Sequence, residues 1–379
     1  MNPKALEEHR ISDIKTLKVT SRYPRMISKN ARVGVHGTGS TAQVRVITTN
    51  QGSVGWGLSW ADEQDMFASL SSSPSVNRPD LIGKSVAELF NPEVGVIHEE
   101  FMPLDFPLHD LAGVILNQPV YQMLGSNGTT VVPCYDGAIY MDDLLPEDNP
   151  RGIEAVLTNC RNDYDLGYRA FKLKIGRGYK WMETEEGLRR DIEVTRKVRE
   201  NFPDCQILVD ANNGYTCDGF IRYFDAVADC SIFWVEEPFH ENREDLSRLK
   251  EFLAKRSPNT LIADGESGYD IESLLKLANE GLVDVLIMDI AGLGFTNWRK
   301  LMPRVIEAKV QISPHTWGNP LKTLYASQLA AGLGNTVTLE GIPTQTSDVD
   351  WSPYELKDGL LHVPAEPGFG ISIKHSIQT

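Results

Sequence analysis

Short apolar runs that end in charged or polar residues recur along the second half of the chain: FKLK at 171–174, ILVD at 207–210, FWVE at 233–236, LIADGE at 261–266, VLIMD at 285–289, VQISPH at 310–315 and VTLE at 337–340. Each run has the length of a buried parallel strand, and the segments between the runs have helical patterning. This alternation predicts an α/β fold, a modified TIM (β/α) barrel. The carboxyl ends of barrel strands meet at one face, so we expect these polar residues to converge on one pocket.

The length of 379 residues leaves room for a second unit beside the barrel. We expect an N-terminal α+β capping domain at 1–128 and the catalytic barrel at 129–350. A C-terminal tail at 351–379 is expected to return and pack on the cap, completing it.

Within the cap, the sequence predicts antiparallel strands at 14–20 and 43–49, with a long polar loop at 21–40 between them. Residues 61–125 are predicted to be helical. A loop as long as 21–40 is usually functional, which makes it a candidate for substrate selection.

Charge and composition limit the classes of binding partner that we expect for this protein. The net charge is −15 at pH 7, whereas nucleic acids and anionic membranes are bound by basic surfaces, so neither is expected. The N-terminal MNPKALEEHR lacks the apolar core of a signal peptide, and no apolar stretch is long enough to span a bilayer, so we expect a cytoplasmic protein. The five cysteines show no C-x-x-C spacing, which argues against a zinc knuckle or a disulfide framework.

Three consecutive predicted strands end in, or are closely followed by, an acidic residue: Asp210, Glu236 and Glu266. Three carboxylates brought together repel one another unless a cation lies among them. Ligation by oxygen alone, without Cys or His, points to Mg²⁺ rather than zinc. Any one of these acids alone would more often cap a helix, but the recurrence on three strands favours a metal site.

Two lysines, Lys172 and Lys174, alternate on one strand, so both should face the barrel interior. Neighbouring cations lower each other's pKa, which would make one of them a competent base near neutral pH. The alternatives are a pair that only neutralises the nearby carboxylates, and a lysine that forms a Schiff base.

His315 and Asp289 end the seventh and sixth predicted strands, which places them within hydrogen-bonding reach of each other. A carboxylate that orients an imidazole is a common acid/base device. Glu340 ends the eighth strand, where it either forms a wall of the pocket and donates a hydrogen bond when protonated, or caps a helix. Polar or aromatic residues near these strand ends and in the 21–40 loop are candidate substrate contacts: Asn212, Arg22, Arg25, Trp317 and Asn319.

This set of motifs resembles the enolase superfamily and, within it, the mandelate racemase-like group, over nearly the whole length. The resemblance rests on the following residues: Lys172-x-Lys174, Asp210-Ala211-Asn212, Val235-Glu236-Glu237-Pro238, Gly265-Glu266, Asp289 with His315, and Thr338-Leu339-Glu340.

The resemblance implies one Mg²⁺ held by Asp210, Glu236 and Glu266. It implies removal of the proton α to a carboxylate to give an enediolate, with Lys174 as the base on one face and His315, oriented by Asp289, on the other. Lys172 would tune Lys174 and touch the substrate carboxylate, to which Glu340 would hydrogen-bond. It also suggests a homo-oligomer.

The expected substrate is a small-molecule carboxylate, and the polar residues predicted for the pocket suit a sugar acid. We therefore predict dehydration of an aldonate or aldarate to a 2-keto-3-deoxy acid. The alternative is a racemase or epimerase that returns the proton from the other face. A barrel without catalysis, acting as a binding module, is a third reading, and the presence of all the expected catalytic residues argues against it.

Overall fold

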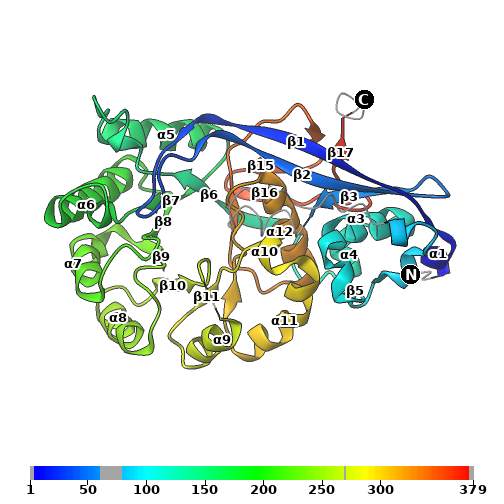
Figure 1. The fold of residues 1–379 in the computed structure, drawn as a ribbon. Coiled ribbons are helices and arrows are strands. Elements are labelled where there is room, and N and C mark those ends of the chain that lie inside the picture. The colour runs from blue at the N-terminus through cyan, green and yellow to red at the C-terminus, as the bar shows by residue number, and fades with distance from the viewer. Residues whose placement is uncertain (1–3, 60–78, 269, 375–379) are drawn as a thin grey trace.

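The computed structural model describes residues 4–59, 79–268 and 270–374. A central sheet contains a strand from each predicted run and one that precedes them: β6 (Val131–Ile139), β7 (Ala170–Lys174), β8 (Gln206–Asp210), β9 (Ile232–Glu236), β10 (Leu261–Asp264), β11 (Val285–Leu286), β12 (Gln311–Ile312) and β13 (Leu339–Gly341). These strands are parallel in the order β12-β11-β10-β9-β8-β7-β6-β13, and an isolated parallel bridge joins Ile312 to Thr336, just before β13. The strands curve into a TIM-like barrel, which confirms the predicted fold class (Figure 1).

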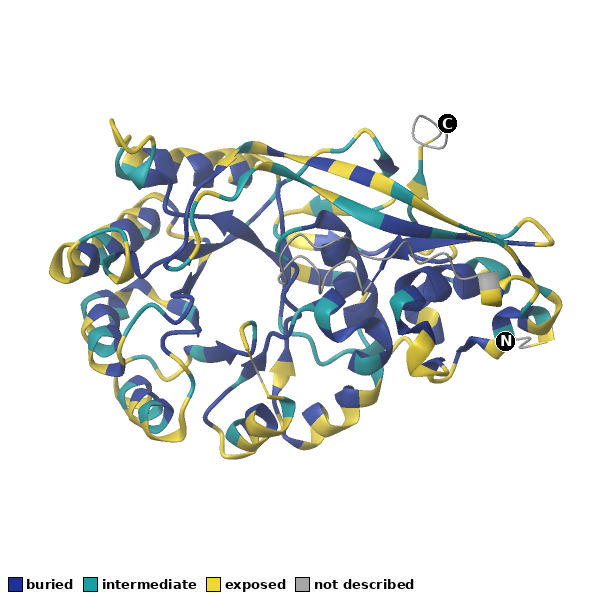
Figure 2. Ribbon diagram, viewed as in Figure 1, coloured by how far each residue is buried: buried dark blue, intermediate teal, exposed yellow. Residues whose placement is uncertain are grey.

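Helices follow the strands and surround the sheet: α5 (Ile153–Asp165), α6 (Thr184–Asn201), α7 (Cys217–Val227), α8 (Arg243–Arg256), α9 (Ile271–Asn279), α10 (Ile290–Leu293), α11 (Phe295–Glu307) and α12 (Pro320–Leu333). Figure 2 shows the barrel strands β6 to β11 mostly buried and the outer faces of α5 to α9 exposed. Helix α12 differs, because its residues from Pro320 to Gly332 are all buried. Within the described ranges, none of the helices has the length and apolar character that crossing a bilayer requires.

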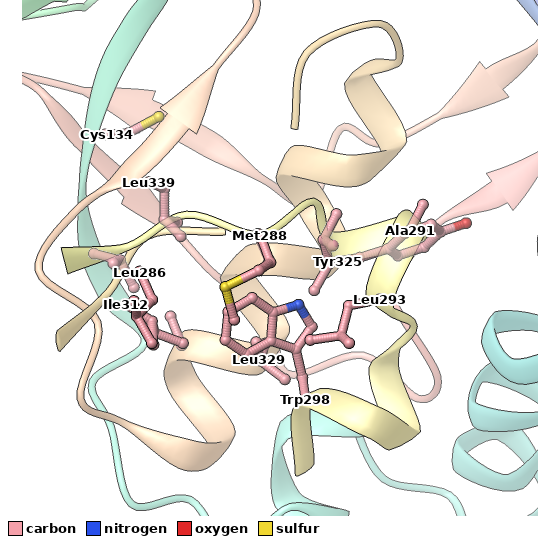
Figure 3. Packing of buried hydrophobic residues seen from close by; sticks show 14 of the residues in the cluster. Cys134, Leu286, Met288, Ala291, Leu293, Trp298, Ile312, Tyr325, Leu329 and Leu339 are labelled. Carbon is pink, nitrogen blue, oxygen red and sulfur yellow. The ribbon is translucent and has the colours of Figure 1, made fainter. Parts of the chain in front are cut away.

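The apolar core is continuous from the barrel into the N-terminal unit. Figure 3 shows one part of it, where Met288, Trp298 and Leu329 point into the same space from the segment after β11, from α11 and from α12. Ridges of apolar side chains from these elements fix the helices against the sheet. This packing holds the carboxyl ends of β11 and β12 in place.

The cap contains a three-stranded antiparallel sheet and short helices: β1 (Ile11–Ile27), β2 (Gly37–Thr49), β3 (Val54–Leu58), α1 (Lys4–Glu8), α3 (Asp105–Leu116) and α4 (Val120–Met123). The predicted loop at 21–40 is too long, because β1 continues to Ile27 and β2 starts at Gly37, which leaves 28–36 between the strands. Cross-strand polar contacts such as Ser21 Oγ to Ser40 Oγ, 2.9 Å, replace the apolar pattern that would have marked these strands. The long hairpin runs from the cap to the barrel (Figure 1).

The prediction that 61–125 is helical is correct only for its last part. Residues 79–104 form 3₁₀ turns and a small hairpin of β4 (Phe90–Asn91) and β5 (Gly95–Val96), while 60–78 lie outside the described residues. Prolines and glycines in this segment, such as Pro92 and Gly95, interrupt helical hydrogen bonding.

The C-terminal segment contacts both units. A hairpin of β15 (Glu355–Lys357) and β16 (Leu360–His362) pairs with β6, so it extends the barrel sheet. Strand β17 (Ser372–Ile373) pairs with β14 (Val349–Asp350). In the segment between β16 and β17, Phe369 N donates to Asp110 of α3, and Trp56 of β3 donates to Ile371 O. This part of the tail therefore contacts the cap. The domain boundaries themselves stay a prediction.

A glycine on β3 sets how closely this strand approaches α3. A Cβ at Gly55 would lie 2.4 Å from the Leu111 Cα, a backbone atom that cannot turn away. We expect Gly55→Ala to lower the free energy of unfolding by about 1–3 kcal/mol through overpacking. Chemical denaturation measures this loss, with Gly34→Ala as the control, since nothing lies within 4 Å of a Cβ there. Equal stability of the two variants would contradict the close packing of β3 on α3.

Candidate active site

Three carboxylates meet at the carboxyl ends of neighbouring strands. Asp210 ends β8, Glu236 ends β9 beside it, and Glu266 follows β10. Ligand oxygens from the three residues all lie within 4.8 Å of one another. The parallel register places Lys174, Asp210 and Glu236 at one level of the sheet. Strand pairing therefore gathers this trio, as the sequence pattern predicted.

The charge balance of the trio fits a divalent cation. Burial, and then Asp210, raise the pKa of Glu236 well above its ordinary range, despite the nearby lysines. Glu266 Oε2 and Asn212 Oδ1 are buried without a hydrogen-bond partner among the residues that the structure describes. An all-oxygen donor set with unused acceptor atoms suits Mg²⁺.

Both lysines of β7 are buried and face the trio. Lys172 Nζ lies 2.8 Å from Glu236 Oε1 and 2.8 Å from Glu340 Oε1, and Lys174 Nζ is bonded to Asp210 Oδ2. Burial lowers the pKa of Lys174, but Asp210 opposes it, and with Glu266 and Glu236 the net shift is upward. The carboxylates around the two lysines raise the lysine pKa values by more than the lysines lower each other's. The expected mutual lowering is therefore outweighed.

His315 approaches the trio from the side opposite Lys174. Its Nδ1 lies 2.9 Å from Asp289 Oδ2, and its Nε2 lies 3.2 Å from Glu266 Oε1. Burial alone would lower the pKa of His315, but Glu266, Glu340 and Asp289 raise it to about 9. Lys174 thus contacts the Asp210 end of the trio, and His315 contacts the Glu266 end.

Glu340, on β13, lies between the lysines and the histidine. Its Oε2 accepts hydrogen bonds from the backbone N–H groups of Thr316 and Trp317, at 2.7 and 3.0 Å. Burial would raise the pKa of Glu340, but Lys172 and His315 lower it to about 2. The carboxylate is therefore ionised and acts as an acceptor here, whereas a hydrogen bond to a substrate carboxylate would need its protonated form.

The tip of the β1–β2 hairpin is fastened over the barrel mouth, which the sequence did not indicate. Arg32 donates to the backbone oxygens of Asn212 and Asn213, at 2.6 and 3.0 Å. Trp181, after β7, donates to Asn30 O at 2.6 Å. These bonds connect the cap hairpin to the loops after β7 and β8, directly beside the trio.

Aromatic residues line one side of the site. Trp317 stacks on Tyr23 with 5.6 Å between ring centroids and lies 4.8 Å from Tyr140. His36, from the hairpin, meets Tyr140 edge-on at 4.7 Å, and Lys174 Nζ lies 5.2 Å from the Tyr140 ring centroid. Trp317 is a predicted contact. Tyr23 and His36, both in the hairpin segment, were missed because the sequence predicts an irregular loop there, and Tyr140, directly after β6, was missed as well.

Of the other four predicted substrate contacts, one lies beside the trio and three do not. Asn212 lies beside the trio. The Asn319 side chain accepts from Leu321 N at 3.0 Å, so it caps α12. Arg22 is exposed on the opposite side of β1 from the buried Tyr23. The Arg25 guanidinium is held by Asp163 of α5, with Nη1 to Oδ1 at 2.8 Å. Asn319, Arg22 and Arg25 are therefore left out of the proposed site.

The position of Arg25 predicts a role in stability. Arg25→Met would leave the fully buried Asp163 and Asp136 carboxylates without their cation. We expect a loss of about 3–5 kcal/mol in unfolding free energy and an unchanged KM. Thermal or denaturant unfolding measures this loss. The control is Arg161→Met on α5, the helix that carries Asp163: Arg161 forms an exposed pair with Glu154, so its replacement should leave stability nearly unchanged. A raised KM at unaltered stability would restore Arg25 as a substrate contact.

Lys322, buried on α12, was also missed. Its Nζ lies 3.1 Å from Asp289 Oδ2, behind the His315 pair. The sequence held a weak signal: a lysine in the first turn of a helix opposes the helix dipole, so it needs a local anion.

Comparisons with known proteins agree with this fold and this site. Residues 155–377 match the family model described as "Enolase C-terminal domain-like". A galacturonate dehydratase from Geobacillus sp., in complex with D-galacturonate and 5-keto-4-deoxy-D-galacturonate, is 32% identical with a TM-score of 0.87, covering 98% of this chain and 96% of that one. A mutant of galacturonate dehydratase from Geobacillus sp., complexed with Mg, is 31% identical with a TM-score of 0.88, covering 98% of this chain and 95% of that one. The D-galactarolactone cycloisomerase of Agrobacterium fabrum is 26% identical over 290 residues, which cover 73% of this chain and 72% of the relative.

The protein is a TIM-like barrel, and three carboxylates that could hold a metal ion lie at the carboxyl ends of its strands. The chain belongs to the enolase superfamily and, within it, to the mandelate racemase-like group.

Proposed function

We propose that this chain is a Mg²⁺-dependent hydro-lyase that dehydrates a sugar acid, and that the acid is a hexuronate. The observation that carries the proposal is the pair of proton-transfer groups, Lys174 and His315, at opposite ends of the carboxylate trio. The likeness to the galacturonate dehydratase over 98% of the chain supports the choice of a hexuronate.

Asp210, Glu236 and Glu266 would hold the metal. A bound Mg²⁺ would supply a Lewis acid that offsets the negative charge developing on the substrate carboxylate, and by taking Asp210 as a ligand it would weaken the contact that keeps Lys174 in its ammonium form. Lys172 would donate a hydrogen bond to the same carboxylate, and its Nζ lies 2.8 Å from Glu340 Oε1.

The chain's residues then move two protons. Neutral Lys174 takes the proton from the carbon α to the carboxylate, and the C–H electron pair moves into the carboxylate to form an enediolate. The enediolate expels the β-hydroxyl with its C–O electron pair, and His315 Nε2 donates the proton that makes it water. The enol left behind becomes a keto acid: counted from the carboxylate it is 2-keto-3-deoxy, and for a hexuronate it is 5-keto-4-deoxy.

A screen of the purified protein with Mg²⁺ against hexuronates, aldonates and aldarates tests this proposal. Semicarbazide absorbance reports the keto acid. We expect a hexuronate to give product and EDTA to abolish it. Product from an aldonate or aldarate alone would keep the dehydratase and overturn the substrate class.

Epimerisation or racemisation is the second candidate, because groups at both ends of the trio allow a proton to leave on one face and return on the other. In D₂O, exchange of the α-proton with inversion and without loss of water would replace the dehydratase by this activity.

A further inference from the structure

Lys322 occupies a position that disfavours a cation. It lies in the first turn of α12, where the helix dipole is positive, and its side chain is only 3% exposed. Burial removes the water that would stabilise an ammonium group. Its contacts offset this cost: Nζ lies 3.1 Å from Asp289 Oδ2 and 3.3 Å from Trp317 O.

Lys322 completes the bonding of the Asp289 carboxylate. Asp289 Oδ1 accepts from the backbone N–H groups of Ala291 and Gly292, both at 2.8 Å. Oδ2 accepts from His315 Nδ1 at 2.9 Å and from Lys322. Four donors use the acceptor capacity of a carboxylate, so the group has one orientation. Without Lys322, the imidazole would be the one side chain among the described residues that still donates to Oδ2.

Lys322 also contacts the segment that carries the histidine. The bond to Trp317 O fixes the backbone from His315 to Trp317, and the N–H groups of Thr316 and Trp317 in turn hold Glu340. One ammonium group thereby connects the histidine, its aspartate and Glu340.

We propose that Lys322 is a positioning residue for the dehydration: through Asp289 and the Trp317 carbonyl it fixes the imidazole of His315 so that Nε2 faces the Glu266 side of the site. The catalytic consequence rests on the proposed function. Lys322 acts through these two groups and not on the substrate.

Two variants separate positioning from simple stability. Lys322→Met keeps the length of the side chain and removes the ammonium group, and Lys322→Gln keeps a donor. We expect Lys322→Met to lower kcat for loss of water by up to about 100-fold with KM nearly unchanged. Exchange of the α-proton through Lys174 should remain, and Lys322→Gln should fall between wild type and Lys322→Met. Lys300→Met, at an exposed lysine of α11, is the matched control and should behave as wild type.

A second readout needs no substrate. In the Mg²⁺-loaded protein with ¹⁵N-labelled histidines, His315 is assigned by its loss in His315→Asn. Above the pKa of His315, where the imidazole is neutral, we expect one tautomer, with the proton on Nδ1, in wild type and a mixture in Lys322→Met. A single tautomer and wild-type kcat in Lys322→Met, with only a lower melting temperature, would overturn the proposal. Wild-type protein that dehydrates no acid would instead refute the proposed function, and the tautomer measurement would still decide the role of Lys322.

Discussion

Replacing Lys174 by methionine is expected to lower kcat by about 10²- to 10⁴-fold, the usual contribution of a positioned proton-transfer group. Methionine is close to lysine in length, so the buried site should need little repacking. The physical reason is the removal of the only base proposed for the α-proton, so exchange of that proton with D₂O should disappear as well. Steady-state kinetics and ¹H NMR measure the two losses.

The control for this prediction is His315→Asn, which removes the other proton-transfer group. We expect it to lose dehydration and to keep α-proton exchange, because Lys174 still acts at the Asp210 end of the trio. Isothermal titration with Mg²⁺ should show binding in both variants. Wild-type turnover or exchange in Lys174→Met would show that another group removes the proton.

Removing one carboxylate of the trio should have an effect of similar size through the metal. Glu266 is the best choice, because its Oε2 has no hydrogen-bond partner among the described residues and its loss disturbs few contacts. We expect Glu266→Gln to weaken Mg²⁺ binding by more than about 100-fold, beyond the effect of changing an outer partner of a metal site. Activity should fall in parallel.

Thermal unfolding provides a readout that does not depend on turnover. Mg²⁺ at 100 times its wild-type Kd should stabilise the wild type by about 2.7 kcal/mol and Glu266→Gln by less than about 0.4 kcal/mol at the same concentration. Glu307→Gln, at an exposed glutamate that ends α11, should respond as wild type. Equal stabilisation of Glu266→Gln would place the metal elsewhere.

The positions of the trio and of the two proposed proton-transfer groups could be predicted because each lies at or just after a strand end. Parallel pairing then determines their neighbours: Asp210 must lie beside Glu236, and Asp289 beside His315. Strand period and strand order are local and repetitive properties, so a single sequence carries them.

The cap hairpin could not be predicted in the same way. Arg25 and Arg32 look equivalent in sequence, yet one pairs with Asp163 under β6 and the other binds the backbone beside the trio. Their partners lie 138 and 180 residues away, and no local pattern records such a pairing. Lys322 illustrates the same limit, because its partner is defined by how α12 packs against the end of β11.

Proton NMR of D-galacturonate with the purified protein and Mg²⁺ in D₂O tests the central claim most directly. The account predicts loss of the H5 signal together with the appearance of a 5-keto-4-deoxy acid that carries one deuterium at C4, and no change when EDTA is added first. If D-galacturonate and the other hexuronates all keep the H5 proton and the C4 hydroxyl, beside a protein that binds Mg²⁺, the account is contradicted.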